Sequence, residues 1–325
     1  MKSNLFLHGN AADWIPCCSL EGIQQRAQTL SSIRQFFADR NVLEVETPIL
    51  SLFPNLDPHQ EPFTFLNSDQ PRYLQSSPEH HMKRLLAAGC PSIYQITRAF
   101  RVGDYGTTHN PEFTLLEWYR VNSTHYALAE EVIELIQRCA GPYSIQQTTY
   151  GEIFESHLHI NPHTVSDALL QEAVFARDSK LHLNDRSSCL DYLWSHAIQP
   201  KFSANTLVLV HDFPVCQAAL ARIEKHNAIE ISNRFEIFVG SLELANGYYE
   251  LQNVEEHHAR FSQAASTFSS KRPIDARFLE ALQHGLPDCA GVALGVDRLI
   301  LLALQQKKLA AKRLADVLTF DWDRA

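Results

Sequence analysis

The sequence predicts an α+β fold in which helices flank an antiparallel sheet. One observation is that Ile93–Phe100 and Phe113–Val121 have strand-like compositions and are separated by a loop rich in Gly, Asp, Asn and Pro. Another is that Arg234–Phe238 and Leu242–Ala245 surround Gly240 as a second hairpin. Helical segments lie between these hairpins. Strands joined by hairpins, with helices between them, are typical of the α+β class.

Length and composition indicate a packed globular protein. The chain has 325 residues, 45% of them apolar, which suits one large domain or two modest ones. Its 28 Lys and Arg residues and 37 Asp and Glu residues give a formal net charge of −9. An acidic chain is a poor electrostatic match for a phosphate backbone, so nucleic acid is not the first partner to expect.

The sequence shows no sign of a membrane or secretory segment. The first residues, MKSNLFLHGNAADW, contain an apolar run shorter than a secretory signal needs. No window approaches the roughly 20 apolar residues of a membrane span. We therefore expect a cytoplasmic protein without membrane contact. The cysteines show no C-x-x-C spacing, so we expect buried or free thiols.

The N-terminal part is predicted to contain an arm, a helix and a strand. Residues 1–22 are polar and irregular, and we expect the domain proper to span residues 23–325. Apolar positions at helical spacing predict a helix over Gln24–Asp39. Val42–Glu46 alternates as a strand does.

A second helix is predicted to begin at Ser77-Pro78, with Ser as N-cap and Pro at the first helical position, and to end at Gly89. Residues 125–204 read as mostly helical and carry no motif that we can interpret. The remaining predicted elements are strands at Thr206–Val210 and Gly291–Leu294 and a helix over Val296–Gln305.

A carboxylate on a predicted core face is the first chemical signal. Along the strand Phe113–Val121, side chains alternate between faces, so Glu117 shares a face with Leu115 and Tyr119. Glu is almost never fully buried without a partner. Glu117 therefore requires a cation, either from a neighbouring Arg or from a ligand, and this strand alone does not decide between them.

Two carboxylates in the second hairpin form another signal. With Val239-Gly240 as the turn, Glu236 faces Glu243 directly; with Gly240-Ser241 the two are diagonal neighbours. Like charges so placed are destabilising by about 0.2–1 kcal/mol. A bound Mg²⁺ would relieve this, since Mg²⁺ is commonly held by one or two carboxylates plus substrate phosphates. The alternative is that both side chains are solvated on an exposed face.

Two glycine-containing segments follow. If Asn246-Gly247 forms a bulge, it would return Glu250 to the face that Glu243 uses. GVALGVDR (Gly291–Arg298) is punctuated by Gly and opens a helix, which suits close approach to an anionic ligand. It does not match Walker or Rossmann spacing, and packing explains such a segment equally well.

In chain order, these pieces resemble the motifs of class II aminoacyl-tRNA synthetases. FFADRNVLEVETP (Phe36–Pro48) resembles motif 1, FR…HNPEFTLLEWY (Phe100–Tyr119) resembles motif 2 with its loop, and ELANGYYEL with GVALGVDR resembles the closing strands and motif 3. SSPEHHMKRLL (Ser76–Leu86) resembles the amino-acid-binding segment of lysyl-tRNA synthetases. The resemblance covers residues 25–325 and implies an ATP-using, adenylate-forming catalytic domain.

Within that group, the chain most resembles the elongation factor P–(R)-β-lysine ligases, which are paralogues of lysyl-tRNA synthetases. About 23 residues precede the motif 1 helix, too few for the five-stranded OB-fold that lysyl-tRNA synthetases place there. The resemblance therefore implies a homodimeric enzyme without an OB-fold anticodon domain and without stable tRNA binding. It would activate (R)-β-lysine with ATP and Mg²⁺ and transfer it to a lysine of elongation factor P.

The resemblance implies roles for individual residues at matching positions. Arg101 would hold and stabilise the α-phosphate as the catalytic cation. The ATP-binding residues would also include Phe113 and Arg298, on opposite faces of adenine, with His109 and Asn110 in the motif 2 loop and Glu243. Glu236 and Glu243 would hold Mg²⁺. The implied substrate-binding residues are Ser76, Glu79, Glu117, Tyr119, Asn246, Glu250 and Ala293.

Among these, Glu79 would bind the amino group near the substrate carboxylate, and Asn246 the carboxylate itself. Glu117, Tyr119 and Glu250 would bind the distal ammonium. The resemblance thus makes the substrate the cation that Glu117 requires.

The chain departs from the family pattern at two positions. Gly103 stands where motif 2 usually has Glu, and Asp104 is positioned to substitute for it. Ala293 stands where lysyl-tRNA synthetases carry Gly, and the β-lysine ligases also have Ala there. Two rivals remain open: a truncated synthetase-like ligase using α-lysine or another amino acid, and a catalytically silent regulatory paralogue. Asparagine synthesis is disfavoured because Glu117 and Glu250 suit a cationic side chain.

Overall fold

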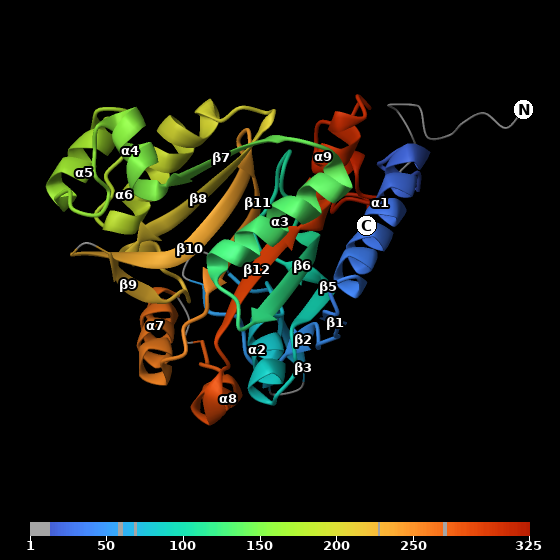
Figure 1. The fold of residues 1–325 in the computed structure, drawn as a ribbon, viewed down its shortest axis with the longest axis horizontal. Coiled ribbons are helices and arrows are strands. Elements are labelled where there is room, and N and C mark those ends of the chain that lie inside the picture. Colours follow the sequence, from blue (N-terminus) through green and yellow to red (C-terminus); the bar gives the residue numbers. More distant parts are fainter. Residues whose placement is uncertain (1–13, 58–60, 68–69, 227, 269–271) are drawn as a thin grey trace, which may run out of the picture.

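The protein is built on one large twisted sheet with helices on both faces (Figure 1). The structure is a computed structural model and describes residues 14–57, 61–67, 70–226, 228–268 and 272–325. The sheet has the order β1-β5-β6-β12-β11-β10-β8-β7, with β9 paired to β10. All its pairs are antiparallel except β1 with β5 and β7 with β8, so the predicted α+β class is confirmed.

The strands of this sheet are β1 (Leu43–Glu44), β5 (Ile93–Phe100), β6 (Glu112–Val121), β7 (Ser144–Thr149), β8 (Thr206–Pro214), β9 (Ile223–His226), β10 (Ile229–Val239), β11 (Leu242–Tyr249) and β12 (Cys289–Gly295). A small second sheet has the order β2-β4-β3, from Leu50–Ser51, Gln70–Leu74 and Thr64–Asn67.

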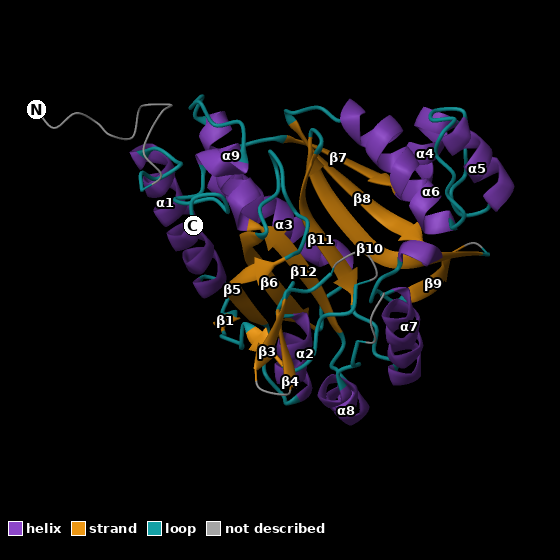
Figure 2. Cartoon of the chain, turned by 180° about the vertical axis from the view of Figure 1, so that it is seen from behind, coloured by secondary structure: helices purple, strands orange, loops and turns teal. Residues whose placement is uncertain are grey.

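The helices divide between the two faces (Figure 2). The helices are α1 (Leu20–Ala38), α2 (Glu79–Ala87), α3 (His125–Ala140), α4 (Tyr150–Leu158), α5 (Asp167–Phe175), α6 (Arg186–Leu193), α7 (Val254–Thr267), α8 (Ala276–Gly285) and α9 (Val296–Gln306). The largest apolar core lies between the sheet and α1, α3 and α9. Helices α2, α7 and α8 form a second core with Ile93 and Tyr119, on the opposite face.

The segment predicted to be mostly helical contains α3 to α6, as expected, but also the edge strand β7. Its sequence, SIQQTT, is largely exposed and polar, so it lacks the apolar alternation that identifies a strand. Helices α4 to α6 pack around Tyr150 and Trp194 and cover the β8 end of the sheet.

Helix α1 begins at Leu20, earlier than expected. The Ser19 side chain accepts a hydrogen bond from the Gly22 N–H at 3.3 Å and so caps the helix. The boundary that we expected between residues 22 and 23 therefore falls inside this helix. Just before it, the Cys17 N–H donates to the carbonyl of Thr319 at 2.7 Å, which ties this stretch to the C-terminal segment. Residues 1–13 lie outside the described residues.

Both predicted hairpins are confirmed. Strands β5 and β6 pair antiparallel, and Val239 lies opposite Leu242 across a Gly240-Ser241 turn. Gly240 has φ +53°, as the first position of a type II′ turn requires. This outcome selects the second of the two registers left open by the sequence.

The bulge expected at Asn246-Gly247 was placed wrongly. Both residues pair regularly with β10, and the extra residue is Leu244, between Ala245 and Glu243. An extra residue changes which side chains share a face, wherever along the strand it lies. Asn246 rather than Ala245 reaches the face of Glu236, and Ala245 is buried in the core.

Other general expectations can be compared with the described residues. None of the described helices is long and apolar enough to cross a membrane. All seven cysteines are described, and each is a free thiol.

Candidate functional site

A transverse row of polar residues crosses the centre of the sheet. Gln95, Glu117, Ala293, Asn246 and Glu236 lie directly opposite one another, in this order, on β5, β6, β12, β11 and β10. Opposed residues project from the same face of a sheet. Four predicted site residues that are widely separated in the sequence are thus brought together.

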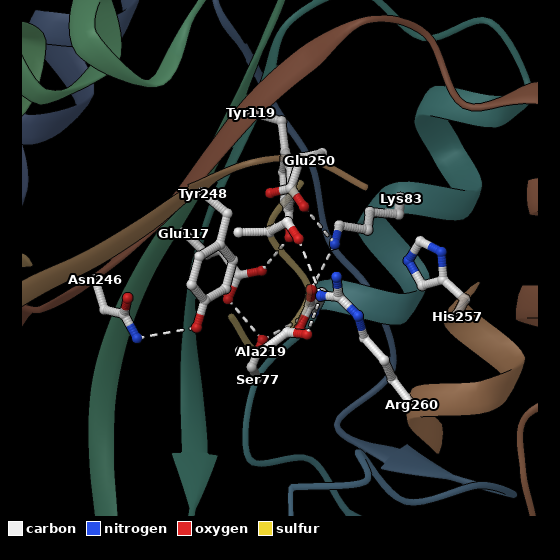
Figure 3. Close-up of polar contacts among 12 residues, drawn as sticks. Ser77, Lys83, Glu117, Tyr119, Ala219, Asn246, Tyr248, Glu250, His257 and Arg260 are labelled. Atoms are coloured by element: carbon white, nitrogen blue, oxygen red, sulfur yellow. Dashed lines mark hydrogen bonds and ion pairs between the residues drawn. The ribbon is translucent and has the colours of Figure 1, made fainter. Parts of the chain in front are cut away.

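A second row lies next to the first and contains Tyr119, Gly291, Tyr248 and Arg234. A Cβ atom at Gly291 would overlap the ring of Tyr119 and the carboxylate of Glu250. Glycine is therefore required here so that these side chains can approach the sheet. Figure 3 shows the predicted set of Glu117, Tyr119 and Glu250 lying close together.

Glu117 is buried and is bonded by two hydroxyl groups. The Tyr119 hydroxyl donates to its Oε1 atom and the Ser77 hydroxyl to its Oε2 atom, both at 2.7 Å. The Ser77 oxygen also accepts the Glu79 N–H at 3.0 Å, at the start of α2. Both donors to Glu117 are neutral, so its negative charge is not balanced by them.

Lys83 is the main residue of the pocket that sequence reasoning missed. Its side chain is fully buried, and its Nζ atom lies 2.5 Å from Glu79 Oε1 and 2.6 Å from Glu250 Oε2. Both carboxylates are among those predicted to bind the substrate, and Figure 3 shows the Lys83 side chain pointing toward Glu250. A signal was present, because Lys83 follows Glu79 by four residues and therefore shares its helix face.

The pocket holds more negative than positive charge. Glu79, Glu117 and Glu250 are three carboxylates, and among the described residues Lys83 is the one ammonium in contact with them. Burial raises the pKa of Glu117 to about 8 and that of Glu250 to about 7, and the Glu79 charge adds to both shifts. Additional cations would neutralise the excess negative charge, so the arrangement suits a ligand with ammonium groups.

Arg234 joins the pocket to the predicted metal carboxylates. Its guanidinium forms an ion pair with Glu236, donates to Asn246 Oδ1 at 3.2 Å, and donates to the Gln217 carbonyl at 2.7 Å. The Gln217 side chain in turn donates to Asp191 on α6 at 2.6 Å. The sequence signal was the spacing of Arg234 and Glu236, two apart on one strand and so on one face.

Glu236 and Glu243 are brought near each other, as the hairpin predicted. Burial raises the pKa of Glu236 to about 7; Arg234 opposes that shift and the charge of Glu243 adds to it. No cluster of three or more possible metal ligands occurs within the described ranges. Two carboxylates nevertheless fit a cation that takes its remaining ligands from phosphates and water.

The residues expected to bind the nucleotide lie at the other end of β6. The guanidinium carbon of Arg101 lies 5.0 Å from the centroid of the Phe113 ring. Arg101 Nε is buried and bonds to none of the described residues. Arg298 instead donates to the Glu243 carbonyl at 2.7 Å, and its Nη2 atom lies 2.9 Å from His109 Nε2. The predicted stacking of adenine between Phe113 and Arg298 stays a prediction.

The other predicted positions have simpler surroundings. Asn110 bridges segments, since its amide donates to the Glu112 carbonyl at 2.6 Å and accepts from the Trp322 N–H at 3.1 Å. Ser76 is buried beside Ser77. Gly103 has φ +86°, which L-residues rarely adopt, so a Glu side chain at that position would be strained. Burial lowers the pKa of Arg298, and the charge of Asp104 partly opposes that shift.

Asp297, in the motif 3 segment, connects it to motif 2 and to helix α1. It forms an ion pair with Arg26 on α1, and its second oxygen accepts the Thr114 N–H on β6 at 2.7 Å. The carboxylate therefore fixes the start of α9, which carries Arg298, relative to Phe113.

Comparison with known proteins shows the family of this chain. The family model of class II tRNA synthetases (D, K and N) matches residues 18–320. The chain is 41% identical to proteins named elongation factor P–(R)-β-lysine ligase from Enterobacter sp. (strain 638) and Salmonella gallinarum, and 40% identical to that of Salmonella arizonae. Each comparison covers 97% of this chain and 99% of the relative. This chain therefore belongs to the class II tRNA synthetases of the D, K and N group.

Proposed function

We propose that the protein is a ligase that activates (R)-β-lysine with ATP and transfers it to a lysine side chain of elongation factor P. The observation that carries the proposal is the excess of carboxylates around Lys83, near one end of β6, with Arg101 beside Phe113 at the other end of that strand. A diamino acid would neutralise that excess. The names of the relatives supply the choice of (R)-β-lysine and of the acceptor.

In the first step, a carboxylate oxygen of (R)-β-lysine attacks the α-phosphorus of ATP. The bond from that phosphorus to the bridging oxygen breaks, and pyrophosphate leaves with the electron pair. Arg101 would stabilise the charge that develops on the α-phosphate, because its guanidinium is permanently charged and already positioned. Asn246 would orient the attacking carboxylate from the central row.

In the second step, the amine of an acceptor lysine attacks the acyl carbon of the adenylate. The carbon–oxygen bond to AMP breaks, AMP leaves with the electron pair, and the amine loses a proton as the amide forms. The polar row would hold the β-lysyl group while the acceptor approaches the acyl carbon.

Mg²⁺ would be held by Glu236 and Glu243, where it would neutralise phosphate charge. Arg234 keeps Glu236 in place and leaves its second oxygen for the ion. The backbone carbonyl of Glu243 accepts a hydrogen bond from Arg298. The Mg²⁺ ion and Arg298, which is expected to lie against adenine, would therefore bind the same nucleotide.

We also propose a homodimer. The elements α1, β1, β2 and β3 lie on one side of the molecule (Figures 1 and 2), and they carry exposed apolar side chains. They are Leu20, Leu43, Leu50, Phe65 and Leu66, and Leu66 is 82% exposed. Such a surface suits a two-fold interface that buries it against a second copy. We further propose a cytoplasmic location. We also propose no stable binding of tRNA, because a net charge of −9 disfavours contact with a phosphate backbone.

The experiment that tests the proposal is ATP–pyrophosphate exchange with (R)-β-lysine, (S)-β-lysine, α-lysine and precursors of asparagine. We expect the fastest exchange with (R)-β-lysine. Preference for α-lysine would favour the truncated synthetase-like ligase. Exchange with none of these amino acids would favour the silent regulatory paralogue.

A further inference from the structure

Lys83 places a protein cation inside the pocket that the substrate's own cations are expected to occupy. Its side chain is fully buried, and its ammonium lies between Glu79 on the same helix and Glu250 at the end of β11. A buried ammonium is expensive unless it is paired, and here both partners are carboxylates within 2.6 Å. The pairing stabilises the ammonium strongly, since the two carboxylates raise the pKa of Lys83 well above its usual range against the effect of burial.

The pairing divides the three carboxylates into two groups. Lys83 contacts one oxygen of Glu79 and one of Glu250, whereas Glu117 is bonded by the neutral hydroxyls of Ser77 and Tyr119. Glu250 is almost completely enclosed, but the Glu79 side chain keeps 19% of its surface exposed. The open acceptors are therefore Glu117 and the outer part of Glu79.

We propose that Lys83 is a specificity-determining residue, which sets the charge of the pocket so that it selects an amino acid with two ammonium groups. With all three carboxylates ionised, as binding of an ammonium requires, three carboxylates and one ammonium leave an excess of two negative charges, which a diamino acid balances. Glu250 then serves chiefly as the partner of Lys83, and the ligand's ammonium groups go to Glu117 and Glu79. The inference rests on the proposed function and extends it to the charge class of the substrate.

Charge-compensated variants separate this role from a structural one. In Lys83→Met, the ammonium is lost and the stem is kept, so Glu79 and Glu250 repel each other without a partner. We expect this repulsion to move Glu79 away from the ligand's ammonium group. The KM for (R)-β-lysine in pyrophosphate exchange should then rise by about 10- to 100-fold, the worth of the hydrogen bond between Glu79 and that ammonium group, with little change in the KM for ATP. In Lys83→Met/Glu250→Gln, one charge of each sign is removed, and we expect the KM to return to within about threefold of the wild type.

A pair of ligands tests the charge class directly. (R)-β-lysine and 6-aminohexanoate differ by one ammonium group. We expect the ratio of their kcat/KM values to fall about 10-fold or more in Glu250→Gln, where the excess is one charge, and to recover in the double variant. Glu224→Gln, on the exposed strand β9, is the matched control and should leave the ratio unchanged.

The outcomes distinguish this inference from the proposed function. A wild-type chain that exchanges with no diamino acid overturns both. An active wild type whose Lys83→Met variant keeps the KM for (R)-β-lysine overturns the inference alone. A double variant that folds, by circular dichroism, but binds worse than either single variant shows that Glu250 serves the ligand directly. If neither variant that lacks Lys83 folds, the residue is structural and the selectivity role is wrong.

Discussion

Arg101 lies over the ring of Phe113, with its guanidinium carbon 5.0 Å from the ring centroid. Its Nε atom is buried and forms no hydrogen bond with the described residues, so this donor is free for a ligand. A cation with unused donors, placed beside an aromatic platform, suits a phosphate next to a stacked base.

We expect Arg101→Ala to lower pyrophosphate exchange by roughly 10²–10³-fold while the protein stays folded, because one preorganised charge donor is lost. Arg98→Ala is the control, since Arg98 lies on β5 three residues before Arg101 but pairs with Glu112 at the surface. Near-normal exchange by the Arg101 variant would contradict the α-phosphate role.

We expect Glu243→Gln and Glu236→Gln each to raise the Mg²⁺ concentration needed for half-maximal exchange, because each removes ligand charge. Glu236→Gln should also lower the free energy of unfolding by about 3–5 kcal/mol, since it leaves Arg234 buried without its carboxylate. Titration of both variants with Mg²⁺ and with urea measures the two effects. Mg²⁺ curves like those of the parent would favour solvated carboxylates.

Glu117 should give the pocket a pH dependence. Its pKa of about 8 lies above the ordinary value, so the native state holds a proton that the unfolded chain has already lost. The stability that this group contributes is therefore present below about pH 4.5 and is lost as the pH rises through 8. Binding an ammonium requires the ionised carboxylate, so binding of (R)-β-lysine at pH 7 should release a proton.

Calorimetry in buffers of different ionisation enthalpy measures that proton release. The KM for (R)-β-lysine should fall as the pH approaches 8, and Glu117→Gln should flatten the profile. A wild-type KM that rises with pH over this range would refute the assignment.

Ala293 is expected to tune the choice between β- and α-lysine. It lies in the central row between Glu117 and Asn246, which are proposed to bind opposite ends of the substrate. One methyl group in a binding pocket changes the discrimination between two substrates by about 1–3 kcal/mol. Ala293→Gly should therefore raise kcat/KM for α-lysine relative to (R)-β-lysine by roughly 10–200-fold. Adenylate formation with each isomer measures the ratio. An unchanged ratio would mean that Ala293 only packs.

We expect no stable aminoacylation of tRNA, because the net charge is −9. A direct charging assay with lysine tRNA measures this. Efficient charging would contradict the ligase proposal and would require a basic groove.

Much of the site could be predicted because it depends on local periodicity. Strand alternation placed Glu117 on an inward face, and turn chemistry placed Glu236 near Glu243. Lys83 was missed because helical spacing shows which face a residue shares, but not that the face is enclosed. Its burial depends on Glu250, which is far away in the sequence. The bulge at Leu244 was also missed, because no Gly or other turn residue marks its position in the sequence.

The central row has a consequence for the energetics of the whole domain. Its residues come from five strands, so local opening of any one of β5, β6, β12, β11 or β10 would dismantle the amino-acid site. The substrate is therefore a ligand of the intact sheet and not of one loop. At 100 times its Kd it would add about 2.7 kcal/mol to the unfolding free energy. That added protection should appear together in the amide hydrogen exchange of all five strands, including those that touch the substrate at a single side chain.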